Sequence, residues 1–132
     1  MYLIDTNIFV YYMKNTYPDM SAKILSMNPA ELFISSISLC ELEYGAEKSN
    51  WGERTRNNLY TLLAPFNFLN FSSQDAIVSG RIRGMLEKKG TPIGTYDTLI
   101  AGQALSRGLI LVTHNTKEFN RIPNLVVEDW VL

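Results

Sequence analysis

The stretch Tyr2-Leu-Ile-Asp-Thr-Asn7 decides the fold, because an apolar run of strand length ends directly on an acidic residue. A helical pattern follows it, from about Asn7 to Met13. The segment Leu109-Ile-Leu-Val112 is a second continuous apolar run of strand length, which is typical of a strand that is buried on both faces. Such strands, separated by helices, indicate a parallel sheet with helices on both sides.

Outward from these two runs, strand and helix patterns alternate along the chain. We expect further short strands at residues 32–34, 66–71 and 125–127, and helices that end near residues 27, 48, 63, 90 and 108. Asp19 or Ser21 is the expected cap of the second helix. The sequence contains no internal repeat or linker, so we expect one α/β domain over residues 1–132.

Composition limits the class of protein. Hydrophobic residues make up 46% of the chain and charged residues 19%, a balance that favours a globular domain over a disordered chain. The single cysteine, Cys40, cannot form an internal disulfide and suits a reducing cytoplasm. We expect a cytoplasmic protein, since no apolar stretch has membrane-spanning length and the N-terminus lacks a secretion signal. The net charge of −1 neither excludes nor favours RNA as a partner.

Four acidic residues lie at or near the predicted strand-to-helix junctions: Asp5, Glu41, Asp97 and Glu118. The carboxyl ends of parallel strands share one edge of a sheet, where ligands bind. If the four side chains converge there, their mutual repulsion favours a bound cation. Oxygen ligands suit Mg²⁺ or Mn²⁺, whereas one cysteine and one histidine make a zinc site improbable.

Each of these acids also has a purely structural interpretation, which spacing alone leaves open. Asp5 or Thr6 is in position to cap the first helix. Ser38 and Glu41 have the three-residue spacing of a capping box. Asp97 lies in the first turn of its helix, where an acid favours the helix dipole. Glu118, taken alone, has the pattern of an exposed turn residue.

Four motifs taken together are more specific than any one acid. They are Leu3-Ile-Asp-Thr-Asn-Ile8, Ser36-Ile-Ser-Leu-Cys-Glu-Leu-Glu-Tyr-Gly45, Gly90-Thr-Pro-Ile-Gly-Thr-Tyr-Asp97 with Leu99-Ile-Ala101, and Leu111-Val-Thr-His-Asn115. In this order and spacing they resemble the PIN-domain ribonucleases, specifically the VapC toxins of bacterial toxin–antitoxin pairs. The resemblance is closest to the enteric-type VapC branch, whose members cut initiator tRNA in the anticodon stem-loop.

The resemblance implies a PIN-domain fold, a three-layer α/β/α sandwich around a mostly parallel sheet of four to five strands. It implies a toxin that hydrolyses RNA phosphodiester bonds with Mg²⁺ or Mn²⁺, with tRNA as the expected substrate. It also implies a homodimer and a VapB-type antitoxin as partner. The alternative is a PIN module that binds RNA or antitoxin without cleavage. A phosphohydrolase with an aspartyl nucleophile is disfavoured, because Asn7 occupies the position of its usual second aspartate.

Site residues follow from matching the motifs position by position. The metal-binding aspartates of the family fall on Asp5 and Asp97, and its catalytic glutamate falls on Glu41. The fourth acidic position is open between Glu118, which we favour, and Asn115, which would be a polar neighbour of the site. The hydroxyl that supports the first aspartate falls on the threonine directly after it, Thr6.

Three side chains are candidates for contact with RNA. Arg81 and Arg83 are candidate phosphate ligands, and Tyr96 is a candidate for stacking on a splayed base. Basic side chains on a helix face are more often simply solvated, however. His114, the only histidine, is more typical of a structural turn residue than of a catalytic base.

Overall fold

Five parallel strands form one sheet in the order β3-β2-β1-β4-β5 in the computed structural model, which describes residues 1–132. The strands are β1 (Tyr2–Ile4), β2 (Leu32–Ser35), β3 (Asn67–Leu69), β4 (Ile110–Val112) and β5 (Val127–Glu128). In the central register, Leu3 is aligned with Phe33 of β2 on one side and with Leu111 of β4 on the other. The predicted parallel α/β sheet is therefore confirmed, with five strands.

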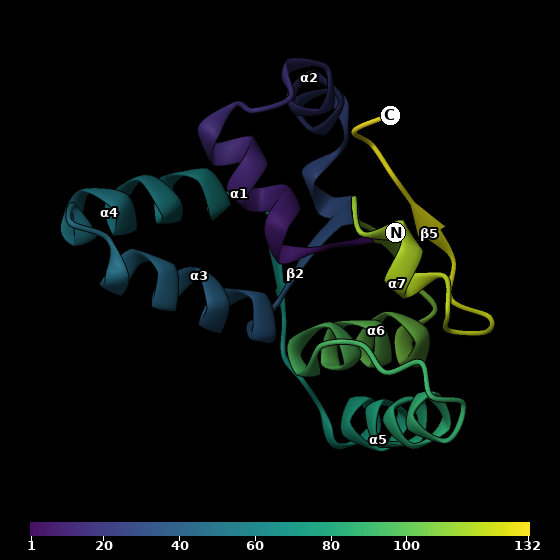
Figure 1. The fold of residues 1–132 in the computed structure, drawn as a ribbon. Coiled ribbons are helices and arrows are strands. Elements are labelled where there is room, and N and C mark those ends of the chain that lie inside the picture. The colour runs from purple at the N-terminus through teal and green to yellow at the C-terminus, as the bar shows by residue number, and fades with distance from the viewer.

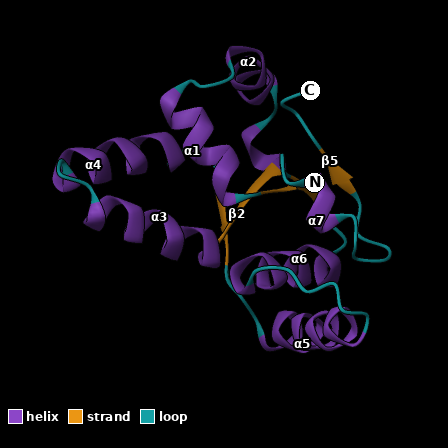
Figure 2. Cartoon of the chain, in the orientation of Figure 1, coloured by secondary structure: helices purple, strands orange, loops and turns teal.

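Helices cover both sides of this sheet. They are α1 (Thr6–Lys14), α2 (Pro18–Ser26), the 3₁₀ turn η1 (Pro29–Glu31), α3 (Ser36–Lys48), α4 (Gly52–Leu63), α5 (Ser73–Lys88), α6 (Thr95–Arg107) and α7 (Thr116–Phe119). In Figure 1, α1 and α2 lie on one side of the strands and α5 and α6 on the other. Helices α3 and α4 run alongside each other and project outward as an arm, and Figure 2 shows the strands between these groups. No helix is both long and apolar enough to cross a membrane.

Two hydrophobic cores lie on the two faces of the sheet, because successive strand side chains point in opposite directions. Ile4 packs in the core beneath α1 and α2, whereas the preceding residue Leu3 packs in the core beneath α5 and α6. Val112 and Leu111 divide in the same way on β4. All four side chains are at most 1% exposed. Each continuous apolar strand thus contributes side chains to both hydrophobic cores, as the sequence pattern predicts.

Helices α5 and α6 approach each other at a glycine. A Cβ atom placed on Gly102 of α6 would lie 1.9 Å from Ser79 Oγ and 2.8 Å from Ser79 Cα on α5. No side chain fits at that distance without a shift of the helices. Ser79 in turn donates a hydrogen bond to the carbonyl of Asp75, which keeps its hydroxyl within α5. Glycine at position 102 therefore sets how closely the outer helix packs on the inner one.

An ion pair between a buried carboxylate and a partly exposed arginine fixes the start of α5 against α6. The Asp75 side chain is fully buried and lies 3.0 Å from Arg107 Nη2. The same carboxylate accepts a hydrogen bond from the Ser72 backbone, and Ser72 accepts one from the Asp75 backbone, which completes a capping box. The pKa of Asp75 is lowered: burial opposes the shift, but hydrogen bonds from Arg107 and Ser72 outweigh it.

The helix starts differ from the sequence prediction in places. The expected caps of α2, Asp19 and Ser21, are wrong, because Tyr17 is the cap and Pro18 is the first helical residue. Proline suits that position, since its fixed φ is already helical and the missing N–H has no partner to lose. The last strand comprises Val127–Glu128 rather than residues 125–127. Helix α5 begins well before the apolar pattern that predicts it, at the capping box.

Candidate active site

The acidic side chains gather at the carboxyl edge of the sheet, and Asp5 is the most deeply placed of them. It follows β1 directly and is 3% exposed. Its Oδ1 accepts a hydrogen bond of 2.8 Å from the Thr6 backbone, so its expected role as the cap of α1 is confirmed. Its Oδ2 accepts a second bond of 2.8 Å from Thr113 Oγ1, at the end of β4. The carboxylate is thus oriented from two neighbouring strand ends.

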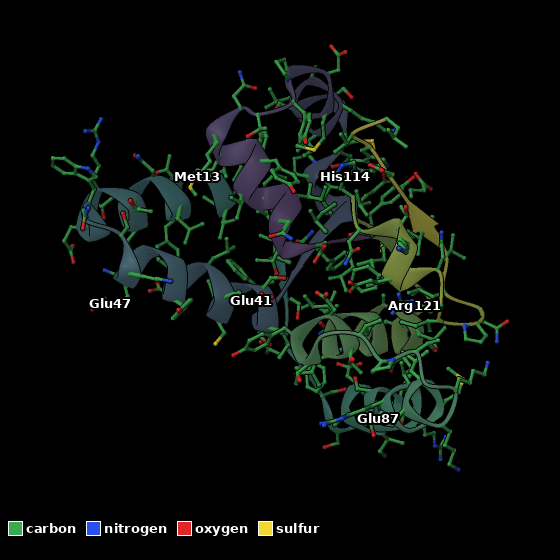
Figure 3. All side chains as sticks on the ribbon, in the orientation of Figure 1. Met13, Glu41, Glu47, Glu87, His114 and Arg121 are labelled. Atoms are coloured by element: carbon green, nitrogen blue, oxygen red, sulfur yellow. The ribbon has the colours of Figure 1, made fainter.

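Glu41 reaches the same edge from α3. The capping box expected between Ser38 and Glu41 is wrong, because α3 begins earlier and its cap is Ser35, whose hydroxyl accepts a hydrogen bond from the Ile37 backbone. Glu41 therefore lies in the second turn of α3, where the backbone does not need its carboxylate. Figure 3 shows Glu41 near the end of α3 that faces the start of α1.

A chain of hydroxyl groups ties Glu41 to the start of α1. Thr6 Oγ1 lies 2.8 Å from Glu41 Oε1 and 2.8 Å from Ser38 Oγ. A carboxylate only accepts and a hydroxyl has one proton, so Thr6 donates to Glu41 and Ser38 donates to Thr6. Ser38 is fully buried. Thr6 therefore connects the two acids: its backbone donates to Asp5 and its hydroxyl donates to Glu41.

Asp97 and Glu118 complete the group from the other layer. Asp97 is half-buried in the first turn of α6, and Glu118 is half-buried in α7. Asn115 Nδ2 donates a hydrogen bond of 3.1 Å to Glu118 Oε2. The Asn115 backbone also donates to Thr113 Oγ1 over 3.0 Å. The segment after β4 thus contacts one acid through Thr113 and a second through Asn115.

Burial and mutual repulsion raise the pKa values of two of the four carboxylates. Burial raises the pKa of Asp97 to about 6, and the charges of Asp5, Glu118 and Glu41 raise it as well. Burial also raises the pKa of Asp5 to about 6, although its hydrogen bonds from Thr113 and Thr6 act in the opposite direction. Each additional negative charge at this edge is therefore unfavourable without a cation.

The donor set fits a hydrated divalent cation. No three histidine, cysteine, aspartate or glutamate side chains lie close enough to form a ready-made cage. Mg²⁺ does not need one, because it retains several water ligands and binds through one or two carboxylates. Asp5 and Asp97 offer oxygen ligands alone, and the raised pKa of each reflects an excess of negative charge or burial that a cation offsets.

A cavity of about 740 Å³ opens beside these acids and continues between α1, α3 and α4. Thr6, Glu41 and Tyr96 line it at the acidic edge, and the Tyr96 side chain is 50% exposed. Arg81 and Arg83 are not part of it. They lie on α5, where Arg83 Nε is paired with Glu87 Oε1 at 3.2 Å on the outer layer. The structure thus brings Tyr96 to the acids and leaves both arginines away from them.

Two buried hydroxyl residues at the site were not predicted as site residues from the sequence, although Ser38 was considered as a helix cap. Thr113 is fully buried and follows β4, and Ser38 lies one helical turn before Glu41. The position of Thr113 directly after a buried apolar strand could have identified it as a candidate site residue. Ser38 has a spacing that fits a capping box equally well, so its contact with Thr6 depends on how α1 packs on α3.

Comparison with known proteins identifies relatives over the full length. The family model described as "PIN domain" matches residues 2–125. The chain is 43% identical over 129 residues to the tRNA(fMet)-specific endonuclease VapC of Salmonella typhimurium, which covers 98% of this chain and 97% of the relative. It is 40% identical, with the same coverage, to the tRNA(fMet)-specific endonuclease VapC of Shigella flexneri. The crystal structure of DNA-bound VapBC from Salmonella typhimurium superimposes with a TM-score of 0.92 at 43% identity, covering 98% of this chain and 97% of that one.

Proposed function

The chain belongs to the PIN-domain family, among the VapC ribonucleases, and from this we propose that it is a toxin that cleaves tRNA at the carboxylate group formed by Asp5, Glu41, Asp97 and Glu118. The observation that carries the site assignment is the hydrogen-bonded arrangement at the carboxyl edge of the sheet, where Thr6 joins Asp5 to Glu41 and Thr113 holds Asp5 from the neighbouring strand end. Burial, together with the charges of the other three acids, also raises the pKa of Asp97. Four carboxylates at one edge of a parallel sheet repel one another, and the capping of α1 by Asp5 accounts for only one of them.

We propose that Asp5 and Asp97 hold Mg²⁺ or Mn²⁺. When bound, the ion would lower the pKa of a water ligand and polarise a phosphoryl oxygen. The chain's own residues do the rest. Thr113 and the Thr6 backbone keep Asp5 in one orientation, and Thr6 keeps Glu41 turned toward the same edge. Glu41 is thereby placed to accept a proton from an attacking water molecule. Asn115 orients Glu118 as the fourth acid.

The substrate class comes from the relatives. Two of them are named as tRNA(fMet)-specific, so we propose initiator tRNA, cut in the anticodon stem-loop, as the substrate. Tyr96 is the candidate for stacking on a splayed base beside the acids, since it lines their cavity. Arg81 and Arg83 would contact only distant parts of a tRNA. We further propose a single PIN domain that acts in the cytoplasm, forms a homodimer and is held inactive by a VapB-type antitoxin, as the family resemblance implies.

The test is cleavage of initiator tRNA by the purified protein in Mg²⁺ or Mn²⁺, with elongator methionine tRNA as the comparison substrate. We expect one cut in the anticodon arm of initiator tRNA, with 5′-phosphate and 3′-hydroxyl ends, and no cleavage in EDTA. Sequencing of the RNA ends gives the position and the chemistry.

A matched pair of variants on one helix isolates the site. Glu41→Gln should lower the cleavage rate at least about 100-fold, while Glu43→Gln, the same change two residues along α3, should leave it within a few-fold. Glu43 instead faces α4, where it accepts hydrogen bonds from Arg56 and Tyr60. Full activity of Glu41→Gln or of Asp97→Asn would overturn the assignment. Tight tRNA binding without metal-dependent cleavage would favour the non-cleaving PIN module.

A further inference from the structure

Three aromatic rings gather just beyond the acidic edge and take no part in the site described above. They are His114, in the segment that follows β4, Tyr11 on α1, and Tyr17 at the start of α2. The Tyr11 and Tyr17 rings are 5.1 Å apart and perpendicular. The His114 ring lies 6.0 Å from that of Tyr17 and 6.4 Å from that of Tyr11. We call these three residues the aromatic platform.

The histidine of the platform is held in a fixed orientation. His114 Nδ1 lies 2.9 Å from Asp129 Oδ2, and the Asp129 side chain is only 9% exposed. Asp129 Oδ1 accepts a hydrogen bond of 2.9 Å from the Val131 backbone, so the carboxylate is itself anchored. Because the carboxylate accepts, the proton lies on Nδ1 and Nε2 is the ring atom left for an external partner. The His114 side chain nevertheless remains 40% exposed.

The position of the platform ties it to the acids. His114 lies between Thr113, which donates to Asp5, and Asn115, which donates to Glu118. Figure 3 shows His114 on the side of the molecule where α1 and α2 lie, apart from Glu41 at the start of α3. A nucleic-acid strand that passes over the acids therefore reaches the platform next on that side.

The charges around the platform suit a phosphate backbone. Lys117 lies three residues after His114 in α7, whereas Lys14 of α1 lines the cavity between α1, α3 and α4. Both lysines are exposed, and neither forms an ion pair with a carboxylate of the chain. An RNA strand that crosses the acidic edge would thus find an unpaired lysine on each side of α1. Partly exposed rings combined with unpaired cations are features with which proteins bind single-stranded nucleic acid.

We propose that the aromatic platform binds an unpaired base of the RNA substrate, on the α1–α2 side of the scissile phosphate. The proposal rests on the proposed ribonuclease function, since it assigns a subsite to that substrate. The base stacks on an exposed ring face, and His114 Nε2 is available for a hydrogen bond to the base or to its ribose. Tyr11 and Tyr17 are partly buried and pack against the hydrophobic core, which holds the platform in place.

The test combines ring removal with base removal. Binding of a fluorescein-labelled stem-loop RNA with the anticodon-arm sequence of initiator tRNA is measured by anisotropy in EDTA, so that no cleavage occurs. The protein variants are His114→Leu and Tyr17→Leu, and the RNA series carries one abasic nucleotide at each loop position. We expect each variant to weaken binding of the intact RNA about tenfold. We expect the same loss from one abasic position, and no further loss when the two are combined.

Controls separate stacking from folding. Tyr17→Phe keeps the ring and should bind RNA like the wild type, and Phe68→Leu removes an exposed ring at the far edge of the sheet, on β3, and should also have no effect. A variant that acted only by loosening the fold would weaken every RNA of the series to the same extent. Circular dichroism establishes that each variant is folded.

The outcomes distinguish this proposal from the proposed function. Cleavage of tRNA with additive effects at every abasic position overturns the platform and leaves the ribonuclease assignment intact. Coupling at one position without any cleavage supports the platform and overturns the ribonuclease assignment. Absence of RNA binding by the wild type overturns the platform, and cleavage of tRNA by the same protein in Mg²⁺ decides the ribonuclease assignment separately. If the variants weaken binding of the antitoxin while their effects on RNA stay additive, the rings serve a protein partner and the RNA platform is overturned.

Discussion

Thr113 Oγ1 donates a hydrogen bond of 2.8 Å to Asp5 Oδ2 and so joins two residues that are 108 positions apart in the sequence. Both residues follow buried strands that are neighbours in the sheet, and the Asp5 backbone also donates to the Val112 carbonyl over 2.9 Å. Because Asp5 is almost fully buried, water supplies little of the solvation that its carboxylate needs. Thr113 is therefore one of the few groups that stabilise the ionised form of Asp5.

Thr113→Val should impair cleavage without preventing folding. Valine has nearly the same shape as threonine, but it removes a hydrogen bond that lowers the pKa of Asp5. Protons will then compete better with the cation for this carboxylate. At a limiting Mg²⁺ concentration, we expect the pH below which the cleavage rate falls to rise by about one pH unit. Thr61→Val, on the exposed side of α4, is the control. An unchanged pH–rate profile for Thr113→Val would contradict the role given to Thr113.

The sequence predicted what depends on local pattern. Apolar runs such as Leu109–Val112 identify the strands, and the alternation with helices predicts a parallel sheet. The positions of Asp5 and Asp97 next to helix starts can also be predicted from local pattern. The packing of α1 on α3 cannot be predicted in this way, because the contact of Thr6 with Glu41 joins residues that are 35 positions apart in the sequence. The mistaken capping box at Ser38 has the same origin, since its local spacing was satisfied while the helix actually began three residues earlier.

The distribution of cations was also beyond the sequence. Arg81 and Arg83 have the composition of a phosphate-binding patch, but the helix that carries them forms the outer layer behind α6. The crossover between strands decides which face of the sheet a helix covers, and the local sequence pattern does not predict that face. The aromatic platform could not be predicted from the sequence either. Tyr11, Tyr17 and His114 come from three separate segments, and nothing in their spacing links them.

Gly102→Ala should destabilise the protein by roughly 1–3 kcal/mol, the usual cost of an added methyl group in a closely packed core. The new Cβ would overlap Ser79, including its backbone, so α5 would have to move away from α6. Gly84→Ala on α5 is the matched control, because a Cβ there meets nothing within 4 Å. That control should be neutral or stabilising by up to about 1 kcal/mol through helix propensity. Urea unfolding measures both changes, and equal stability of the two variants would refute the close contact.

Arg107→Ala should cost about 1–3 kcal/mol of unfolding free energy, because it removes charge-assisted hydrogen bonds from the buried Asp75 carboxylate, although the arginine side chain itself is 33% exposed. Arg83→Ala removes an arginine from the exposed pair with Glu87 on the neighbouring helix and should cost less than about 0.5 kcal/mol. The contrast tests burial, since both variants lose one arginine–carboxylate pair. Thermal unfolding of the two variants at the same pH decides it. A similar loss in both would mean that water reaches Asp75.

The stability of the metal-free protein should fall as the pH rises through the range in which Asp5 ionises. The pKa of Asp5 is raised by burial from 3.8 to about 6, so the folded state binds this proton more tightly than the unfolded state does. The favourable contribution is therefore fully present below about pH 4 and is lost as the pH approaches and passes 6. The difference corresponds to a loss on the order of 2–3 kcal/mol for the wild type.

Asp5→Asn removes this ionisation, and because it also removes one of the charges that raise the pKa of Asp97, the change that it produces includes the relief of that repulsion. The unfolding free energy of the variant, measured in urea with EDTA, should rise relative to the wild type by at least that amount between pH 4 and pH 8. Asp19→Asn, an exposed aspartate on α2, should show no comparable trend. Addition of Mg²⁺ should stabilise the wild type at pH 8 and leave Asp5→Asn nearly unchanged, since binding to the folded state alone adds to its stability. A pH-independent difference between wild type and Asp5→Asn would show that Asp5 is ionised and satisfied without a cation, and the metal assignment would then have to move to other carboxylates of the edge.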